Sequence, residues 1–149
     1  MQYISEFFSN RIMWTGALGW ITAQVLKAIF VLICEKKFDF KRLVGSGGMP
    51  SSHSSFVMSL STAIGLEEGF DSTYFAIAIV ISFITMYDAA GVRRAAGLQA
   101  KTLNMIMEEF SKGEILTAEI KLKELLGHTP VEVIAGAILG IVIAIIRHA

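Results

Sequence analysis

The chain has 149 residues, of which 54% are hydrophobic and 17% are charged. Soluble globular proteins average about 45–50% apolar and about 25% charged residues, so this composition is shifted toward that of a membrane protein. Thirteen Lys and Arg residues balance thirteen Asp and Glu residues, which argues against a strongly basic nucleic-acid-binding protein. One cysteine and two prolines exclude a disulfide scaffold and a proline-rich disordered chain. The length predicts a single domain, residues 1–149, integral to the membrane.

Four apolar stretches are long and not alternating, and are therefore expected to be helices that cross the membrane. The first, Met13–Cys34, has 22 residues and one charge, and spans about 33 Å as a helix, enough for a hydrocarbon core. The second covers residues 56–66 and is rich in Ser and Thr; the others are Thr73–Tyr87 and Val133–Ile146. We predict an all-α polytopic membrane helical bundle with about four transmembrane helices. A soluble four-helix bundle is the alternative.

Residues 95–126 form the one sizeable stretch outside these runs, with apolar side chains at helical spacing. We predict one or two amphipathic helices there, at the membrane surface or under the bundle. In the last apolar run, Gly136 and Gly140 have the G-x-x-x-G spacing that lets another helix approach closely. This spacing makes a homodimer a candidate assembly.

Basic residues are unevenly distributed along the chain. Ten of the thirteen fall in segments 35–49 and 89–128, which a four-span topology places on one side, whereas segment 67–72 carries only acidic charges. The positive-inside rule predicts that the basic side is cytoplasmic and that both termini lie outside. The expected location is the bacterial cytoplasmic membrane.

Each proline lies within three residues of a histidine: Pro50 precedes His53, and Pro130 follows His128. Proline is favoured in the first turn of a helix, so each pair predicts a helix start, and both starts fall on the cytoplasmic side in this topology. Helix N-termini present free N–H groups that suit a phosphate. Two histidines beside a phosphate can act as nucleophile and general acid. The third histidine, His148, is expected to have no role.

Hydroxyl and cationic side chains accompany these histidines. The candidates for phosphate binding are Ser51, Ser52, Ser54, Lys41, Arg42, Arg93 and Arg94. Arginine in particular matches phosphate oxygens bidentately. Simpler roles stay open, because the serines can form a polar helix start and the cations can determine topology. Glu132 fits a capping box at the last helix start, a role that can coexist with catalysis.

Two charged residues lie in or beside apolar runs. Asp88 is expected to pair with Arg93 or Arg94, whereas Lys27, in mid-span, has no assigned partner. No group of His, Cys and Asp has the spacing of metal ligands, so neither a metal nor a cofactor is expected.

Several of these motifs resemble those of a known family. P-S-S-H-S, which contains His53, is similar to the second signature of the type 2 phosphatidic acid phosphatase superfamily. G-H-T-P-V-E-V-I-A-G-A-I-L-G, which contains His128, is similar to its third signature. With Y-D-A-A-G-V-R-R-A-A-G-L-Q-A, these strings resemble the divergent branch of the superfamily, related also to vanadium-dependent haloperoxidases, over residues 10–147. The first signature and the Ser-Arg opening of the third are missing.

The resemblance implies a helical bundle that hydrolyses a phosphomonoester or pyrophosphate of a lipid, without a metal, through a phosphohistidine. It implies that His128 is the nucleophile, that Glu132 orients it and that His53 protonates the leaving group. The partners would be membrane lipids and a phosphorylated lipid substrate. The alternative, which the missing signature residues favour, is a non-catalytic binder or transporter of phosphorylated lipids on the same fold.

Overall fold

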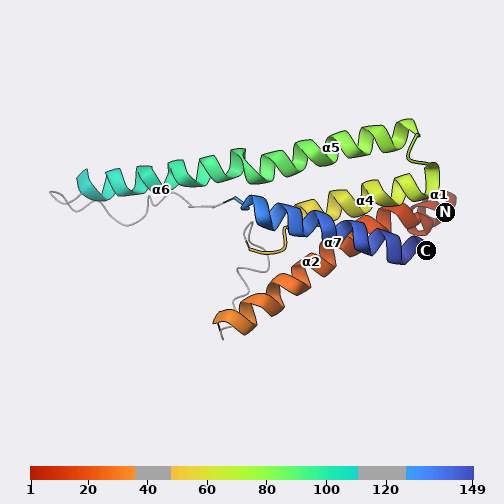
Figure 1. The fold of residues 1–149 in the computed structure, drawn as a ribbon, viewed down its shortest axis with the longest axis horizontal. Coiled ribbons are helices and arrows are strands. Elements are labelled where there is room, and N and C mark those ends of the chain that lie inside the picture. Colours follow the sequence, from red (N-terminus) through yellow and green to blue (C-terminus); the bar gives the residue numbers. More distant parts are fainter. Residues whose placement is uncertain (36–47, 111–126) are drawn as a thin grey trace.

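A computed structural model describes residues 1–35, 48–110 and 127–149, and these three ranges contain helices and short connections but no strand. The helices are α1 (Gln2–Ser9), α2 (Arg11–Glu35), α4 (Ser52–Glu68), α5 (Thr73–Ala90), α6 (Val92–Phe110) and α7 (Pro130–His148) (Figure 1). The all-α prediction is confirmed. Lys41, Arg42 and residues 111–126 of the predicted amphipathic segment lie outside the described ranges.

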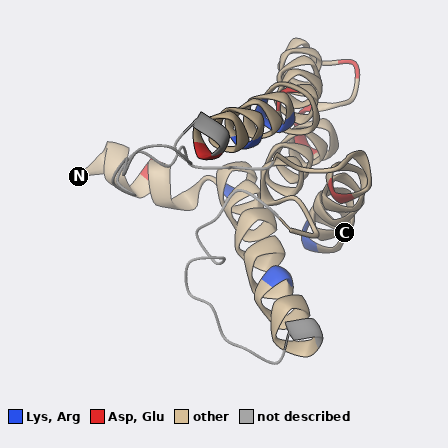
Figure 2. Cartoon of the chain, turned by 90° about the vertical axis from the view of Figure 1, so that its left-hand side faces the viewer, with Lys and Arg blue, Asp and Glu red and all other residues tan. Residues whose placement is uncertain are grey.

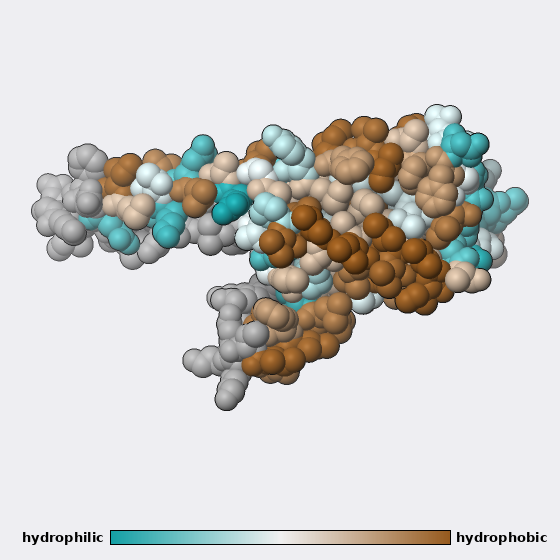
Figure 3. Space-filling model, in the orientation of Figure 1, coloured by the Kyte–Doolittle hydropathy of each residue, from teal (hydrophilic) through white to brown (hydrophobic). Residues whose placement is uncertain are grey.

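Within the described ranges, three helical segments are long and apolar enough to cross a membrane: Arg11–Ile33, Thr73–Glu108 and Pro130–His148. They match the first, third and fourth predicted spans. On the face shown in Figure 3, hydrophobic residues cover much of the bundle, and hydrophilic ones gather at one end and along α6. The second predicted span is α4, which has 17 residues and packs against α2, α5 and α7. Its companions therefore shield much of this serine-rich helix from lipid.

Small residues allow α4 to lie close to both α2 and α7. A Cβ added to Gly136 would collide with the carbonyl oxygen of Ser51, and one added to Gly140 would collide with that of Ser55. On the α2 side, the Ser55 hydroxyl donates a 2.8 Å hydrogen bond to the carbonyl oxygen of Gly19. Glycines let helix backbones approach closely. The G-x-x-x-G spacing is thus used inside the chain, and it gives no support to a homodimer.

The helices α4 and α7 lie side by side and begin at the same end of the bundle, while both chain termini lie at the opposite end (Figure 1). Pro130 is the first residue of α7, as predicted. The prediction for Pro50 is wrong by two residues, because α4 begins at Ser52 and its N-cap is Ser51. The Ser51 hydroxyl accepts a hydrogen bond from the backbone N–H of Ser54, which the proline ring cannot do.

The third histidine, His148, links three helices at the end of the bundle where both termini lie. His148 Nδ1 lies 2.9 Å from Glu67 Oε1, and His148 Nε2 lies 2.8 Å from the Thr15 hydroxyl oxygen. These contacts join α7 to α4 and α2. The expectation that His148 has no role is therefore wrong, because the side chain fastens the C-terminal end to the bundle.

The helix α6 begins earlier than the predicted amphipathic segment, at Val92, directly after the α5 C-cap Gly91. It continues nearly in line with α5 and extends past the end of the bundle rather than folding beneath it (Figure 1). Several residues of α6 are charged, whereas the helices of the bundle carry few charged residues (Figure 2). The first turn of α6 is the part that reaches the site described next.

Candidate active site

His128 lies in the connection that leads into α7, and it is held on both its backbone and its ring. Its backbone N–H donates a 3.1 Å hydrogen bond to the carbonyl oxygen of Ala89, near the end of α5. Its ring Nδ1 lies 3.0 Å from Glu132 Oε2, four residues later. Because a carboxylate only accepts hydrogen bonds, this contact places the proton on Nδ1 and leaves the lone pair of neutral His128 on Nε2.

The Glu132 carboxylate also belongs to the start of α7. Its Oε2 accepts a 3.0 Å hydrogen bond from the backbone N–H of Thr129, and the Thr129 hydroxyl accepts from the Glu132 N–H at 3.3 Å. This reciprocal pair is the predicted capping box. Capping and the contact with His128 therefore occur together, through the same carboxylate oxygen.

His53 lies in the first turn of α4, beside His128. The centroids of the two imidazole rings are 5.9 Å apart, and their planes are inclined by 67°. Arg93, from the first turn of α6, places Nη1 3.5 Å from His53 Nε2 and donates from Nε to Asp88 Oδ2 at 2.7 Å. The predicted partner of Asp88 is thus Arg93. Residues 53, 93 and 128, far apart in the sequence, lie together at one end of the bundle.

Four buried polar atoms in this region have no hydrogen-bond partner among the residues that the structure describes: Lys27 Nζ, His53 Nδ1, Ser54 Oγ and His128 Nε2. Lys27 is 2% exposed and lies near enough to both histidines and to Glu132 to interact with them electrostatically. Burying a cation without a partner costs several kcal/mol, because the ion loses its hydration. The unpaired Lys27 ammonium group, together with Arg93 at His53, suits an anionic ligand beside the two histidines.

Lys27 is the site residue that sequence reasoning did not assign. Its aliphatic stem packs against Gly48, where an added Cβ would lie 3.4 Å from Lys27 Cγ and Cδ, and the positive φ of 92° favours glycine there. A signal for Lys27 exists in the sequence, because Gly19, Ala23 and Lys27 recur every four residues. This spacing places the three on one face of α2, the face that Gly19 presents to α4.

The predicted phosphate-binding serines have different environments. Ser51 is the α4 N-cap, Ser52 is buried in the first turn, and Ser54 is fully buried with an unpaired hydroxyl. The interpretation as a polar helix start is therefore right for Ser51, whereas the buried Ser54 side chain lies on the side of α4 that packs against Gly136 of α7. Arg94 is exposed, and it follows Arg93 by the roughly 100° turn of an α-helix, so the two guanidinium groups do not point the same way.

Burial and nearby cations favour the neutral form of His128. Burial lowers the pKa of His128 from its ordinary value of 6.5, and the positive charges of Lys27 and Arg93 lower it further. The hydrogen bond and the negative charge of Glu132 raise the pKa of His128 and oppose this shift in part. The net direction is downward, which keeps the Nε2 lone pair unprotonated at neutral pH.

These features define a class of protein: a helical membrane protein with two histidines, a buried lysine and an arginine at the shared start of two central helices. The sequence model of the Divergent PAP2 family matches residues 8–143. An uncharacterized membrane protein of Bacillus subtilis (strain 168), YuiD, is 39% identical over 151 residues, which cover 95% of this chain and 96% of the relative. No solved structure matches the chain significantly. The chain belongs to the Divergent PAP2 family, which confirms the resemblance found in its motifs.

Proposed function

We propose that this protein is a membrane lipid-phosphate phosphatase that transfers the phosphoryl group of its substrate to His128 and then to water. The observation that carries the proposal is that unpaired, buried Lys27 Nζ and His128 Nε2 lie within electrostatic reach of each other, beside His53 and Arg93. A phosphate group would accept hydrogen bonds from the ammonium and guanidinium groups, and its phosphorus is the electrophile that a free imidazole nitrogen attacks.

In the first step, the lone pair of His128 Nε2 attacks phosphorus while the bond from phosphorus to the lipid oxygen breaks. The imidazole that carries the phosphoryl group becomes positively charged, and the Glu132 carboxylate, 3.0 Å from Nδ1, stabilises that charge. His53, which the bound phosphate anion keeps protonated against the lowering of its pKa by burial and by Arg93, gives its proton to the leaving lipid oxygen. The lipid alcohol departs, and His53 is left neutral.

In the second step, a water molecule attacks the phosphoryl group on His128, and neutral His53 takes a proton from that water. The bond between Nε2 and phosphorus breaks, inorganic phosphate is released and both histidines return to their starting forms. Lys27 and Arg93 neutralise the charge that spreads over the phosphoryl oxygens in both steps. No metal takes part in this scheme.

The positive-inside rule supports a cytoplasmic-facing site in a bacterial membrane. Arg93, Arg94 and Lys101 lie at or beyond the end of the bundle that carries His53 and His128. The opposite end carries Glu67, Glu68 and Asp71. We therefore propose that the phosphate is taken from the cytoplasmic leaflet.

The test is phosphate release from a lipid phosphate by the purified protein in detergent, with and without vanadate. We expect turnover that vanadate inhibits, and at least a thousandfold loss in His128→Ala. A matched control is His148→Ala, which removes a histidine from the far end of the same helix and should reduce turnover only as far as it reduces the folded fraction. Full activity of His128→Ala would refute the mechanism. Lipid-phosphate binding without release, unchanged in that variant, would instead support a non-catalytic binder or transporter.

A further inference from the structure

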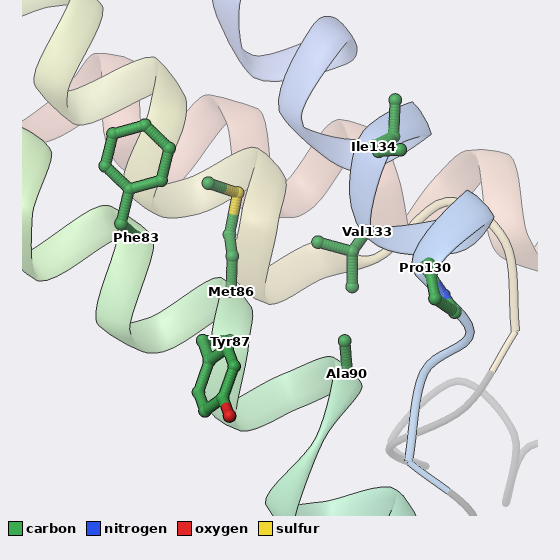
Figure 4. A pocket seen from close by; sticks show the side chains of 7 residues that line it. All are labelled: Phe83, Met86, Tyr87, Ala90, Pro130, Val133 and Ile134. Carbon is green, nitrogen blue, oxygen red and sulfur yellow. The ribbon is translucent and has the colours of Figure 1, made fainter.

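An apolar groove of 380 Å³ lies between α5 and α7. Its volume is within the range of about 300–1,000 Å³ that is typical of ligand pockets. Seven side chains line it, four from α5 and three from α7, and they surround an open space between the two helices (Figure 4). Among them are Phe83, Tyr87, Ala90, Pro130 and Ile134. Apart from the Tyr87 hydroxyl, all of these side chains are apolar.

One end of this groove adjoins the candidate active site. Ala90 follows Ala89, whose carbonyl oxygen accepts the hydrogen bond from the His128 backbone, and Pro130 is two residues beyond His128. From there the groove extends along α5 to Phe83, about 10 Å at 1.5 Å per residue. The groove therefore begins within two residues of His128 along the chain, at the same end of the bundle.

The groove is open on its outer side. Phe83, Tyr87 and Ile134 are all exposed, and they belong to two segments that are long and apolar enough to cross a membrane. The surface around them is therefore hydrophobic, as it is over much of the bundle in Figure 3. A hydrocarbon chain can enter from the side, from within the bilayer, without passing through water.

We infer that this groove holds the first part of the hydrocarbon chain of the phosphorylated lipid, so that the lipid enters between α5 and α7 with its phosphate toward His128. The inference rests on the proposed function and names the path of its substrate. The cations Lys27 and Arg93 interact electrostatically with His128, whereas the seven residues that line the groove carry no charge. This polarity matches an amphiphile with one anionic end. In a bilayer the chain is already in hydrocarbon, so the groove selects chain shape rather than adding hydrophobic affinity.

The experiment uses a lipid phosphate with a photoreactive diazirine in its chain, close to the phosphate. The purified full-length protein in lipid nanodiscs is irradiated with this probe, and the labelled residues are identified by mass spectrometry. The same lipid without its phosphate is the control ligand. We expect labelling of α5 and α7 at the groove that is at least tenfold stronger with the phosphate than without it.

Two variants and one matched control accompany this measurement. Ala90→Phe fills the groove from α5 and Ile134→Trp fills it from α7, so either should reduce groove labelling at least tenfold. Thermal unfolding shows whether each of the two variants folds. If only one of them folds, the labelling result of that variant decides the test. Ala76→Phe adds the same ring to an exposed position of α5 that does not line the groove, and should leave labelling unchanged.

The outcomes separate this inference from the proposed function. Groove labelling without phosphate release from any substrate would support the groove and refute the phosphatase. Phosphate-dependent labelling on other helix faces, with release intact, would refute the groove alone. Equal labelling by the phosphate-free lipid would identify a bystander lipid, and cross-linked dimers would identify a second copy, so either result would refute the inference. If labelling did not depend on the phosphate and no phosphate were released from any substrate, both proposals would fail.

Discussion

Glu132 uses one carboxylate oxygen for two hydrogen bonds, one from Thr129 N–H and one from His128 Nδ1. The substitution Glu132→Gln separates the structural role of this residue from its electrostatic role. The amide oxygen of the new side chain can still accept from both donors, so the helix cap remains. What disappears is the negative charge beside the imidazole ring.

The distance sets the size of the expected effect. Two unit charges 3.0 Å apart attract by about 5 kcal/mol at an effective dielectric constant near 20. The Glu132 side chain is 21% exposed, so water screens part of this attraction. We expect about 3 kcal/mol of lost transition-state stabilisation, or roughly a 100-fold lower kcat. The free energy of unfolding should change by less than about 1 kcal/mol, because the cap is retained.

The assay combines phosphate release from a lipid phosphate with chemical unfolding of the same preparation. Thr129→Ala is the matched control, because it removes the hydroxyl that accepts from Glu132 N–H and leaves the charge beside His128. It should cost about 1 kcal/mol of stability and change kcat by less than about threefold. If Thr129→Ala lowered kcat as much as Glu132→Gln did, Glu132 would act only by shaping the helix start. A kcat of Glu132→Gln within threefold of the wild type would also refute the reasoning.

Three further predictions concern other parts of the site and the bundle. Lys27→Met removes a buried ammonium group, so Tm should stay unchanged or rise. Vanadate binding, measured by titration, should weaken at least tenfold. Unchanged vanadate binding would contradict the role of Lys27 in holding the anion. Because burial lowers the pKa of His128, the unfolded chain takes up a proton more readily below pH 6.5, so the free energy of unfolding should fall as the pH drops below that value. In His128→Gln, denaturant titrations should show a smaller decrease in the free energy of unfolding below pH 6.5. An equal decrease would refute the attribution of this pH dependence to His128. Gly136→Ala places a Cβ against the Ser51 carbonyl oxygen and should cost roughly 2–4 kcal/mol. Gly16→Ala meets ordinary contacts of 3.4 Å or more and should change stability by less than about 1 kcal/mol; equal effects would contradict the close packing of α4 and α7.

The sequence alone predicts the helices and places the two histidines on the same side of the membrane, because both depend on local patterns. Apolar length sets the spans, and an even number of membrane crossings between His53 and His128 returns the chain to the same side. The ring separation of 5.9 Å agrees with that expectation. The serine-rich α4 is harder to interpret, since its burial depends on Gly19, Gly136 and other small residues of its neighbours rather than on its own hydropathy.

The parts that sequence reasoning missed depend on helix phase and on the ends of helices. Lys27 reads as an isolated charge in an apolar run, and only the phase of α2 against α4 shows that it lies beside the histidines. Similarly, nothing local indicates that α6 continues in line with α5, or that His148 reaches Glu67 from the last turn of α7. Each of these features is a contact between elements, which periodicity within one element does not determine.

The central claim is that His128 Nε2 receives the phosphoryl group, and trapping the phosphorylated protein tests it most directly. The purified protein is mixed with a lipid phosphate that carries a labelled phosphorus atom, denatured in alkali within milliseconds, digested and mapped by mass spectrometry. We predict label on the His128 imidazole, at no more than one phosphoryl group per chain, and none in His128→Ala. Release of phosphate with no label on His128, or with label on another residue, would contradict the claim.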